Sequence, residues 1–210
     1  MKQRDPETRE RVLRAAAQLF ADRGFKKVTV RDICRAARAN VAAVNYHFGD
    51  KSGLYREVLQ RAIQIVRATS DAAREAGKGH PADERLRRYI QVSLCRVVAE
   101  GHPTWISRLI HREIADPTPA FDALVDQGIR PRIDDLSAIV ADVLGCPVGD
   151  ERVARCVVSI HSQWVLFAPS SLASRLRSKF QLRSESPDRI AEHIADFSLA
   201  GIRAVRSGSG

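Results

Sequence analysis

The sequence lacks the features that mark several large classes of protein. Its four cysteines are scattered over 210 residues, without a CxxC pair or a Cys/His spacing that gathers a metal. Reduced thiols in the core are therefore expected, and no metal site. No apolar run approaches the roughly 20 residues of a membrane span. The polar start of the chain lacks the apolar region of a signal peptide, so a cytoplasmic protein without a membrane partner is expected.

Motifs of the common catalytic sites are absent as well. There is no GxSxG, no Gly-rich phosphate loop, no HExxH and no convincing pair of acids. The sequence His111-x-Glu113 is too short a pattern to indicate a metal site. The sequence therefore predicts a protein that is not an enzyme and needs no cofactor. Since no segment alternates apolar and polar residues, an all-α fold is expected.

Basic charge is concentrated near the N-terminus. Residues 1–51 contain 12 Lys or Arg and 6 Asp or Glu, a net charge of +6, whereas the other 159 residues contain 22 and 19, a net charge of +3. An excess of this kind favours a polyanionic partner such as DNA and raises the rate of encounter with it. A basic but merely solvated surface is the alternative.

The segment 29–51, TVRDICRAARANVAAVNYHFGDK, has the pattern of a helix-turn-helix. Apolar residues recur at helical spacing on both sides of a break at residues 38–40. Thr29 with Asp32 predicts a capping box for the first helix, and Asn40 is a suitable N-cap for the second. The second helix would bury Val41, Val44 and Phe48 and present small and polar residues to DNA.

Further helices are predicted on both sides of this segment. One precedes it and ends near Gly24, and a long one follows over residues 51–76. The rest of the chain predicts helices over 82–100, 104–115, 119–144, 150–167 and 187–205, with a kink at Pro131. The last two have broad apolar faces, which is typical of helices with a partner. We expect a three-helix DNA-binding domain at 1–51, joined by the long helix to a larger helical domain at 52–206, whose last two helices favour dimerisation; the resemblance described next implies that this domain also binds a ligand.

The segments TVRDICRAA and NVAAVNYHFGDKSGLY resemble the N-terminal domain of TetR-type transcriptional regulators. The match covers about residues 8–60. In the second half, REIADPTPAFD and SIHSQWVLF are similar to the ligand-binding domain of the CecR-like subgroup. The resemblance implies an all-helical homodimer whose heads bind successive major grooves of a palindromic operator and whose C-terminal domain binds a small effector. Two positions depart from the family pattern, because Arg38 replaces the usual Gly and Asn45 the usual Tyr.

Candidate DNA contacts follow from side-chain chemistry. Asn45 is suited to a bidentate contact with adenine, and Ala42 or Ala43 to a thymine methyl group. The resemblance favours phosphate or sugar contacts for Tyr46 and His47. Helix N-termini and basic groups that suit phosphates add three more residues: Thr29, Arg31 and Lys51. A solvent-facing amide remains the alternative for Asn45, and a solvated charge for the two basic residues. The expected DNA-contacting set is Thr29, Arg31, Asn40, Ala42, Ala43, Asn45, Tyr46, His47 and Lys51.

An effector site is expected where polar or aromatic residues lie beside apolar stripes of the second half. The candidate residues are Trp105, Arg108, Arg112, Glu113, His161, Gln163 and Trp164. Simple core packing is the alternative for the two tryptophans, and a hydrogen-bonded core histidine for His161.

The function that fits best is a ligand-responsive regulator, expected to be a repressor, that binds a double-stranded DNA operator as a homodimer. Dimerisation is expected through residues 150–167 and 187–205. The alternative is a nucleoid-associated or cell-division DNA-binding protein with the same fold, which acts through a protein partner. The sequence alone does not separate these two hypotheses.

Overall fold

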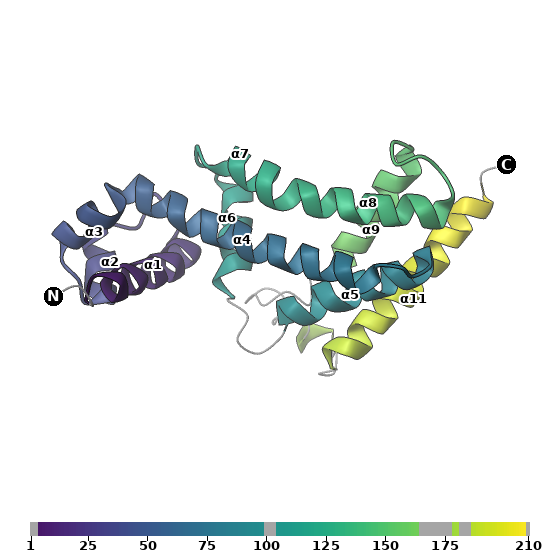
Figure 1. Ribbon diagram of the computed structural model, residues 1–210, viewed down its shortest axis with the longest axis horizontal. Helices are drawn as coiled ribbons and strands as arrows, with labels where there is room; N and C mark the ends of the chain where they lie inside the picture. Colours follow the sequence, from purple (N-terminus) through teal and green to yellow (C-terminus); the bar gives the residue numbers. More distant parts are fainter. Residues whose placement is uncertain (1–3, 99–103, 164–177, 181–185, 209–210) are drawn as a thin grey trace. The chain divides into compact units, whose positions relative to one another are not determined.

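The computed structural model describes residues 4–98, 104–163, 178–180 and 186–208. Every regular element within these residues is a helix, which confirms the expected all-α fold (Figure 1). None of the described helices is long and apolar enough to cross a membrane. The helices are α1 (Arg4–Arg23), α2 (Val30–Ala37), α3 (Val41–Phe48), α4 (Lys51–Gly77), α5 (Ala82–Val98), α6 (Trp105–Ala115), α7 (Phe121–Leu124), α8 (Arg130–Leu144), α9 (Glu151–Gln163) and α11 (Pro187–Ser207).

The chain divides into two compact units. Unit 1 comprises residues 1–65 and 103–127, and unit 2 comprises residues 66–102 and 128–210. The long helix α4 therefore contributes its first turns to unit 1 and its last turns to unit 2. These units are defined by contacts within the fold. The boundary expected after residue 51 separates functions, namely DNA binding from ligand binding and dimerisation, and it stays a prediction.

Unit 1 is built on a small apolar core that α1 to α4 share. Each of these helices repeats its apolar residues at intervals of three or four, so one face of each is buried. At the end of this core, the rings of Phe20 and Tyr55 meet edge to face with their centres 4.9 Å apart. The buried side chains include Val12, Leu13, Ala16, Phe20, Ile33, Cys34, Ala37, Val44, Phe48, Leu54, Tyr55, Val58 and Leu59.

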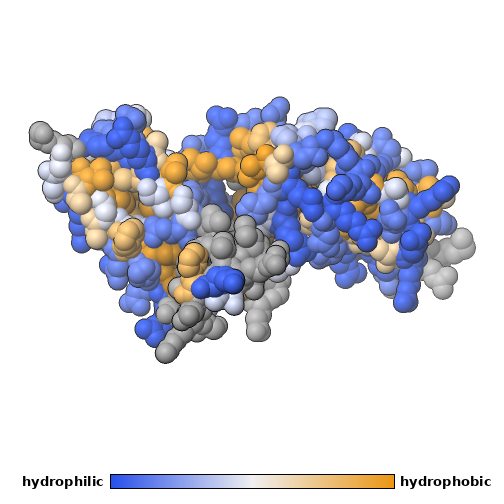
Figure 2. Space-filling view, turned by 180° about the vertical axis from the view of Figure 1, so that it is seen from behind, coloured by the Kyte–Doolittle hydropathy of each residue, from blue (hydrophilic) through white to orange (hydrophobic). Residues whose placement is uncertain are grey.

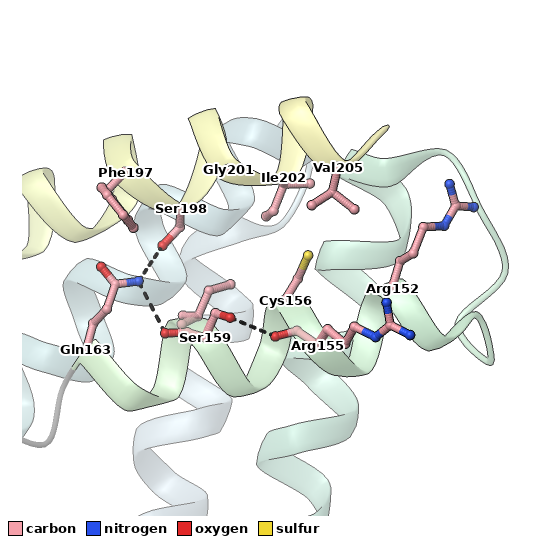
Figure 3. Close-up of a pocket in the computed structure, with 11 residues that line it drawn as sticks. Arg152, Arg155, Cys156, Ser159, Gln163, Phe197, Ser198, Gly201, Ile202 and Val205 are labelled. Carbon is pink, nitrogen blue, oxygen red and sulfur yellow. Dashed lines mark hydrogen bonds between the residues drawn. The ribbon is translucent and has the colours of Figure 1, made fainter. Parts of the chain in front are cut away.

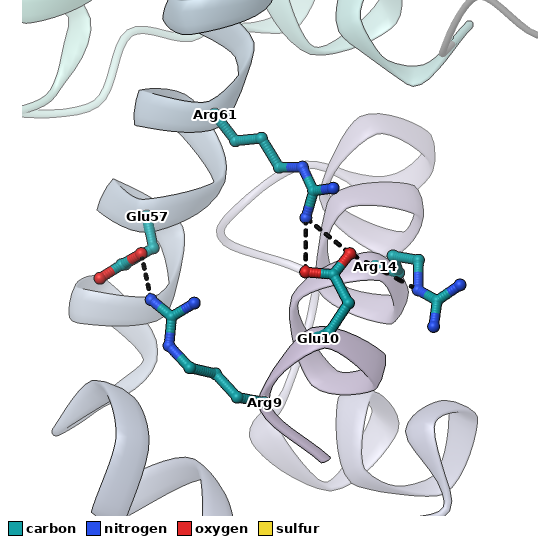
Figure 4. A network of polar contacts seen from close by, with 5 residues as sticks. All are labelled: Arg9, Glu10, Arg14, Glu57 and Arg61. Carbon is teal, nitrogen blue, oxygen red and sulfur yellow. Dashed lines mark hydrogen bonds and ion pairs between the residues drawn. The ribbon is translucent and has the colours of Figure 1, made fainter. Parts of the chain in front are cut away.

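Ion pairs join α1 to α4 beside this core (Figure 4). Arg9 lies 2.7 Å from the carboxylate of Glu57, and its guanidinium also lies 5.3 Å from the ring centre of Phe48. One nitrogen of Arg61 donates to both carboxylate oxygens of Glu10, at 2.7 and 2.8 Å. Partly exposed pairs of this kind contribute little stability, about 0.2–1 kcal/mol each. Their main effect is to fix the register of α1 along α4.

Helix α6 also packs within unit 1 and is fastened to α1. Arg112 Nε donates to the carbonyl oxygen of Ala21 at 2.7 Å, and its Nη2 donates to that of Asp22. Because the last carbonyls of a helix have no partner within the helix, this guanidinium caps the C-terminal end of α1. Arg108 lies 3.2 Å from the carboxylate of Asp22 and completes the attachment.

A buried carboxylate connects α6 to α4. Glu113 is only 1% exposed and accepts a hydrogen bond from the hydroxyl of Tyr55. Its other oxygen accepts from the backbone N–H and the hydroxyl of Thr118, at 3.2 and 3.1 Å. Burial and the neighbouring carboxylate raise the pKa of Tyr55, so the phenol keeps its proton and remains a donor. The carboxylate is thus satisfied by three donors inside unit 1.

The core of unit 2 is formed by α5, α8, α9 and α11. Tyr89 is fully buried there, and its hydroxyl donates to the carbonyl oxygen of Arg132 at 3.1 Å. The other large buried side chains include Leu86, Ile90, Leu94, Leu136, Val140, Val153, Ile160, Ile194, Leu199 and Ile202.

The helix predicted over 119–144 is present over residues 121–144, although it is not a regular α-helix throughout. The structure has the short helix α7, a π-helical segment at Val125–Ile129, and then α8. Pro131 directly follows the π-helical segment and lies within this continuous helical stretch. A proline inside a helix removes the hydrogen bond to the carbonyl four residues earlier, here that of Gln127 in the π-helical segment. The position of the irregularity therefore fits the proline, and the kink expected at Pro131 stays a prediction.

We predict that Glu113→Ala lowers the free energy of unfolding by about 2–3 kcal/mol, because it leaves the buried Tyr55 hydroxyl and the Thr118 donors without an acceptor. Glu113→Gln, which keeps an amide oxygen in the same place, should lose about 1 kcal/mol or less. Urea denaturation of both variants measures the difference. Equal losses in the two variants would contradict the assigned role of these hydrogen bonds.

Candidate nucleic-acid interface

The start of α2 carries the capping box that the sequence predicts. The hydroxyl of Thr29 accepts from the Asp32 backbone N–H at 3.2 Å, and the Asp32 carboxylate accepts from the Thr29 backbone N–H at 3.1 Å. The hydrogen bonds from Thr29 lower the pKa of Asp32, and the charge of Arg35 adds to this effect. Both polar groups of the box are therefore engaged in the helix start.

The end of α2 is a tight left-handed turn at Arg38. Its φ of 50° and ψ of 48° make it the one residue other than glycine with a positive φ in the described part of the chain. The Arg38 N–H donates to Arg35 O, and the Ala39 N–H donates to Cys34 O at 3.0 Å. These two bonds form a Schellman motif, which usually contains glycine at this position. Arg38 therefore adopts the geometry that glycine would adopt without steric cost.

The second helix of the motif begins at Asn40, whose side-chain oxygen accepts from the Ala43 N–H at 2.7 Å. Val44 and Phe48 are buried, as predicted. The expectation that Val41 also lies in the core is wrong, because Val41 is 44% exposed. It is the first residue of α3 and precedes the turn that packs on α1 and α2.

The outer face of α3 presents the predicted polar residues. Asn45 is exposed, and Tyr46 is 76% exposed, an unusual fraction for a large aromatic side chain. His47 is half-buried, and the centre of its ring lies 5.0 Å from that of Tyr46 and 5.9 Å from that of Phe48. Ala42 is exposed and small enough to allow a close approach to α3.

Lys51 makes contacts within the protein that could not be predicted from the sequence. Its ammonium group donates to the carbonyl oxygens of Phe25 and Val28, at 3.0 and 3.1 Å, and lies 4.3 Å from the centre of the Phe25 ring. The residue therefore fastens the loop between α1 and α2 to the start of α4. The phosphate contact expected for Lys51 stays a prediction, and so do the expected DNA contacts of the other eight residues.

Gly53 is a structural requirement that the sequence analysis missed. A Cβ atom added here would lie 2.0 Å from the carbonyl oxygen of Phe48, so no other residue fits without a shift of the backbone. The Gly53 N–H donates to the Asp50 carboxylate at 2.6 Å. The only signal in the sequence was the short segment GDKSG directly after the predicted recognition helix.

The seven predicted effector residues do not form one described cluster. Trp105, Arg108, Arg112 and Glu113 belong to α6 in unit 1, where the last three bind α1, α4 and Thr118 as described above. Trp105 is only 7% exposed and is part of the core. Trp164 lies outside the described residues. The predicted ligand-binding role of this set stays a prediction.

The remaining two candidates, His161 and Gln163, lie on α9 in unit 2. Gln163 lines a groove of about 270 Å³ between α9 and α11, and its amide donates to the hydroxyl of Ser198 at 3.2 Å (Figure 3). Phe197 and Val205 of α11 line the same groove and are 65% and 38% exposed. Burial lowers the pKa of His161 to about 4, and the charge of Arg132 adds to this effect.

Two protein families match this chain. The family described as bacterial regulatory proteins, tetR family, matches residues 12–58. The family described as the C-terminal domain of the HTH-type transcriptional dual regulator CecR matches residues 82–202. The first covers the helix-turn-helix, and the second covers most of α5 to α11.

The individual proteins to which this chain is similar are transcriptional regulators as well. The chain is 26% identical to the HTH-type transcriptional dual regulator CecR of Shigella flexneri over 155 residues, which is 70% of this chain and 69% of that protein. It is 33% identical to an HTH-type transcriptional repressor of Mycobacterium tuberculosis over 163 residues, 75% of this chain and 72% of that protein.

Solved structures share the fold at low sequence identity. A TetR-like transcriptional regulator from Rhodococcus sp. RHA1 superposes with a TM-score of 0.65 at 18% identity, over 93% of this chain and 96% of that chain. The TetR family regulator PfmR from Thermus thermophilus superposes with a TM-score of 0.62 at 18% identity, over 90% and 97% of the two chains.

We predict that the protein loses stability as the pH falls from 7 to 5. The unfolded chain binds a proton at His161 near pH 6.5, whereas the folded chain does so only near pH 4. The lost stability amounts to about 2 kcal/mol at pH 5. His161→Gln should remove most of this loss, whereas the exposed His193→Gln should not. Urea denaturation at the two pH values measures it, and an unchanged pH dependence in His161→Gln would refute the assignment.

Proposed function

Because the chain belongs to the TetR family of bacterial transcriptional regulators, with a C-terminal domain of the CecR type, we propose that it is a ligand-responsive repressor. In this proposal it acts in the cytoplasm, binds a palindromic operator as a homodimer, and leaves the operator when a small-molecule effector binds. The repressor role is supported by the related repressor of Mycobacterium tuberculosis.

The observation that carries the proposal is the geometry of α3. Its N-cap and the left-handed turn at Arg38 fix its start, while Val44 and Phe48 anchor its inner face. Asn45 and Tyr46 are left exposed on the outer face. A helix held in this way can enter a major groove without losing its own packing. Asn45 then supplies the amide that pairs with an adenine edge.

The proposed dimer uses α9 and α11. Both helices carry large apolar side chains that are exposed in the single chain, among them Val158 and Phe197, each at 65%. Figure 2 shows apolar surface over the part of unit 2 that contains these helices. Gly201 faces open space at the centre of the same groove, which permits a close approach of a second backbone. Two copies joined here would carry two recognition helices for the two half-sites of a palindrome.

The proposed effector binds in the C-terminal domain, as the resemblance to the family implies. Helix α4 connects the two units covalently, because its residues 51–65 belong to unit 1 and its remaining residues to unit 2. The chain also passes between the units at 102/103 and 127/128, and of these three connections α4 is the one that leads directly into the helix-turn-helix. An effector that binds one arrangement of α4 more tightly would change the separation of the two heads. This separation would then no longer match the spacing of the two half-sites.

The central experiment selects DNA from a random library with the purified protein and measures binding to the enriched sequence. A repressor of this type should enrich a palindrome and bind it in a salt-sensitive manner. Enrichment of no sequence, or of many unrelated ones, would contradict the proposal. The second outcome would favour the nucleoid-associated alternative. A compound that releases the selected DNA would identify an effector.

We predict that Asn45→Ala lowers discrimination at one base pair of each half-site by about 1–3 kcal/mol, which is roughly 5- to 150-fold, because the bidentate contact is lost. Arg31→Ala should instead weaken binding to all sequences alike and reduce the salt dependence, because it removes a phosphate contact. Competition binding with single-base variants of the selected operator measures both effects. If the two variants behave identically, the division into base and phosphate contacts is wrong.

We predict that Phe197→Asp makes the protein monomeric, because it places a charge in the apolar face formed by α9 and α11. Ile114→Asp is the matched control, since Ile114 is also apolar and is 57% exposed but lies on α6 in unit 1. Sedimentation velocity at micromolar concentration measures the assembly state. A dimeric Phe197→Asp that is folded by circular dichroism would place the interface elsewhere.

A further inference from the structure

Three arginines form a stripe along α2 and its C-terminal turn. Arg31 and Arg35 are four residues apart, which places them on one side of α2, and Arg38 follows directly in the left-handed turn that ends the helix. All three are exposed. Among the residues that the structure describes, no hydrogen bond or ion pair engages their guanidinium groups. Many other arginines of the chain are paired with carboxylates, including Arg9, with Glu57, and Arg61, with Glu10.

The acidic residue of α2 does not neutralise the arginine stripe. The one acidic residue of α2 is Asp32, and its carboxylate is engaged by the hydroxyl and the backbone N–H of Thr29, at 2.6 and 3.1 Å. The charge of Arg35 has only a minor effect on the pKa of Asp32. The stripe therefore presents three solvated positive charges beside the start of α3.

Arg38 is held in this stripe at a conformational cost. Its left-handed backbone is unfavourable for a residue with a Cβ, and glycine or asparagine would adopt it more easily. The side chain has no described partner that would offset this strain within the chain. Strain without a structural gain is typical of positions whose side chain acts on a ligand.

We propose that Arg38 binds a phosphate of the DNA backbone, next to Arg35, and so extends the predicted phosphate contact of Arg31 along the whole of α2. This inference rests on the proposed DNA-binding function, because the first helix of a helix-turn-helix crosses the DNA backbone when the second enters the groove. Each guanidinium that binds a phosphate releases condensed counterions and contributes to affinity without regard to sequence.

The inference predicts opposite effects of Arg38→Gly on folding and on binding. The variant should unfold at a temperature about 2–4 °C higher, because the strain is removed. Each subunit of the proposed dimer contributes one Arg38, so the variant loses two phosphate contacts per operator. It should bind the selected operator about 25-fold more weakly at 0.15 M salt, roughly fivefold per subunit, and the slope of log affinity against log salt should fall by about 1.8. Thermal unfolding by circular dichroism and a salt series of fluorescence-anisotropy titrations measure the two effects.

Two further variants and a control separate charge from strain. Arg38→Lys keeps the charge and should keep the salt slope. Arg38→Asn suits the left-handed conformation but is neutral, so it should bind like Arg38→Gly. Arg67→Asn removes the same charge from an exposed position of α4 in unit 2 and should leave the slope unchanged.

The results distinguish this inference from the function on which it rests. If the wild-type protein binds its operator with a steep salt slope, and both neutral Arg38 variants bind with the same slope and affinity, the phosphate contact is refuted and the function stands. If the wild-type protein shows no salt-sensitive binding to any selected DNA, the proposed function falls and the inference falls with it.

Discussion

The turn between α2 and α3 is the constraint on which the recognition surface depends. Two backbone hydrogen bonds, from Arg38 to Arg35 and from Ala39 to Cys34, close α2 and reverse the chain within three residues. Arg11 of α1 supports the same turn, because its Nε donates to the carbonyl oxygen of Ala37 at 3.3 Å. The direction of α3 is thus set by backbone geometry, and its side chains remain available for DNA.

Most of this local structure could be predicted from the sequence. Helix caps need only neighbouring residues, so the sequence alone identifies Thr29 with Asp32, and Asn40 at the start of α3. The helical period also finds Val44 and Phe48. It fails for Val41, because at the first residue of a helix the period does not say whether the adjoining elements extend far enough to cover the side chain.

The contacts between distant segments could not be predicted. Glu113 reaches Tyr55, Arg112 reaches Ala21, and Lys51 reaches Phe25, over separations of 26 to 91 residues. A polar residue beside an apolar stripe looks the same in sequence whether it lines a pocket or satisfies a buried partner on another helix. For this reason the sequence places Glu113 and Arg112 at an effector site, although the described contacts of both are inside unit 1.

These distant contacts bear on how an effector could act. The first turns of α4 hold the head in several places: Lys51 binds the loop before α2, Gly53 packs on the Phe48 carbonyl, and Glu57 and Arg61 bind α1. A displacement of α4 would therefore carry α1, α2 and α3 with it as one body. The internal geometry of the recognition surface would then stay intact, and an effector would control the position of the surface more than its shape.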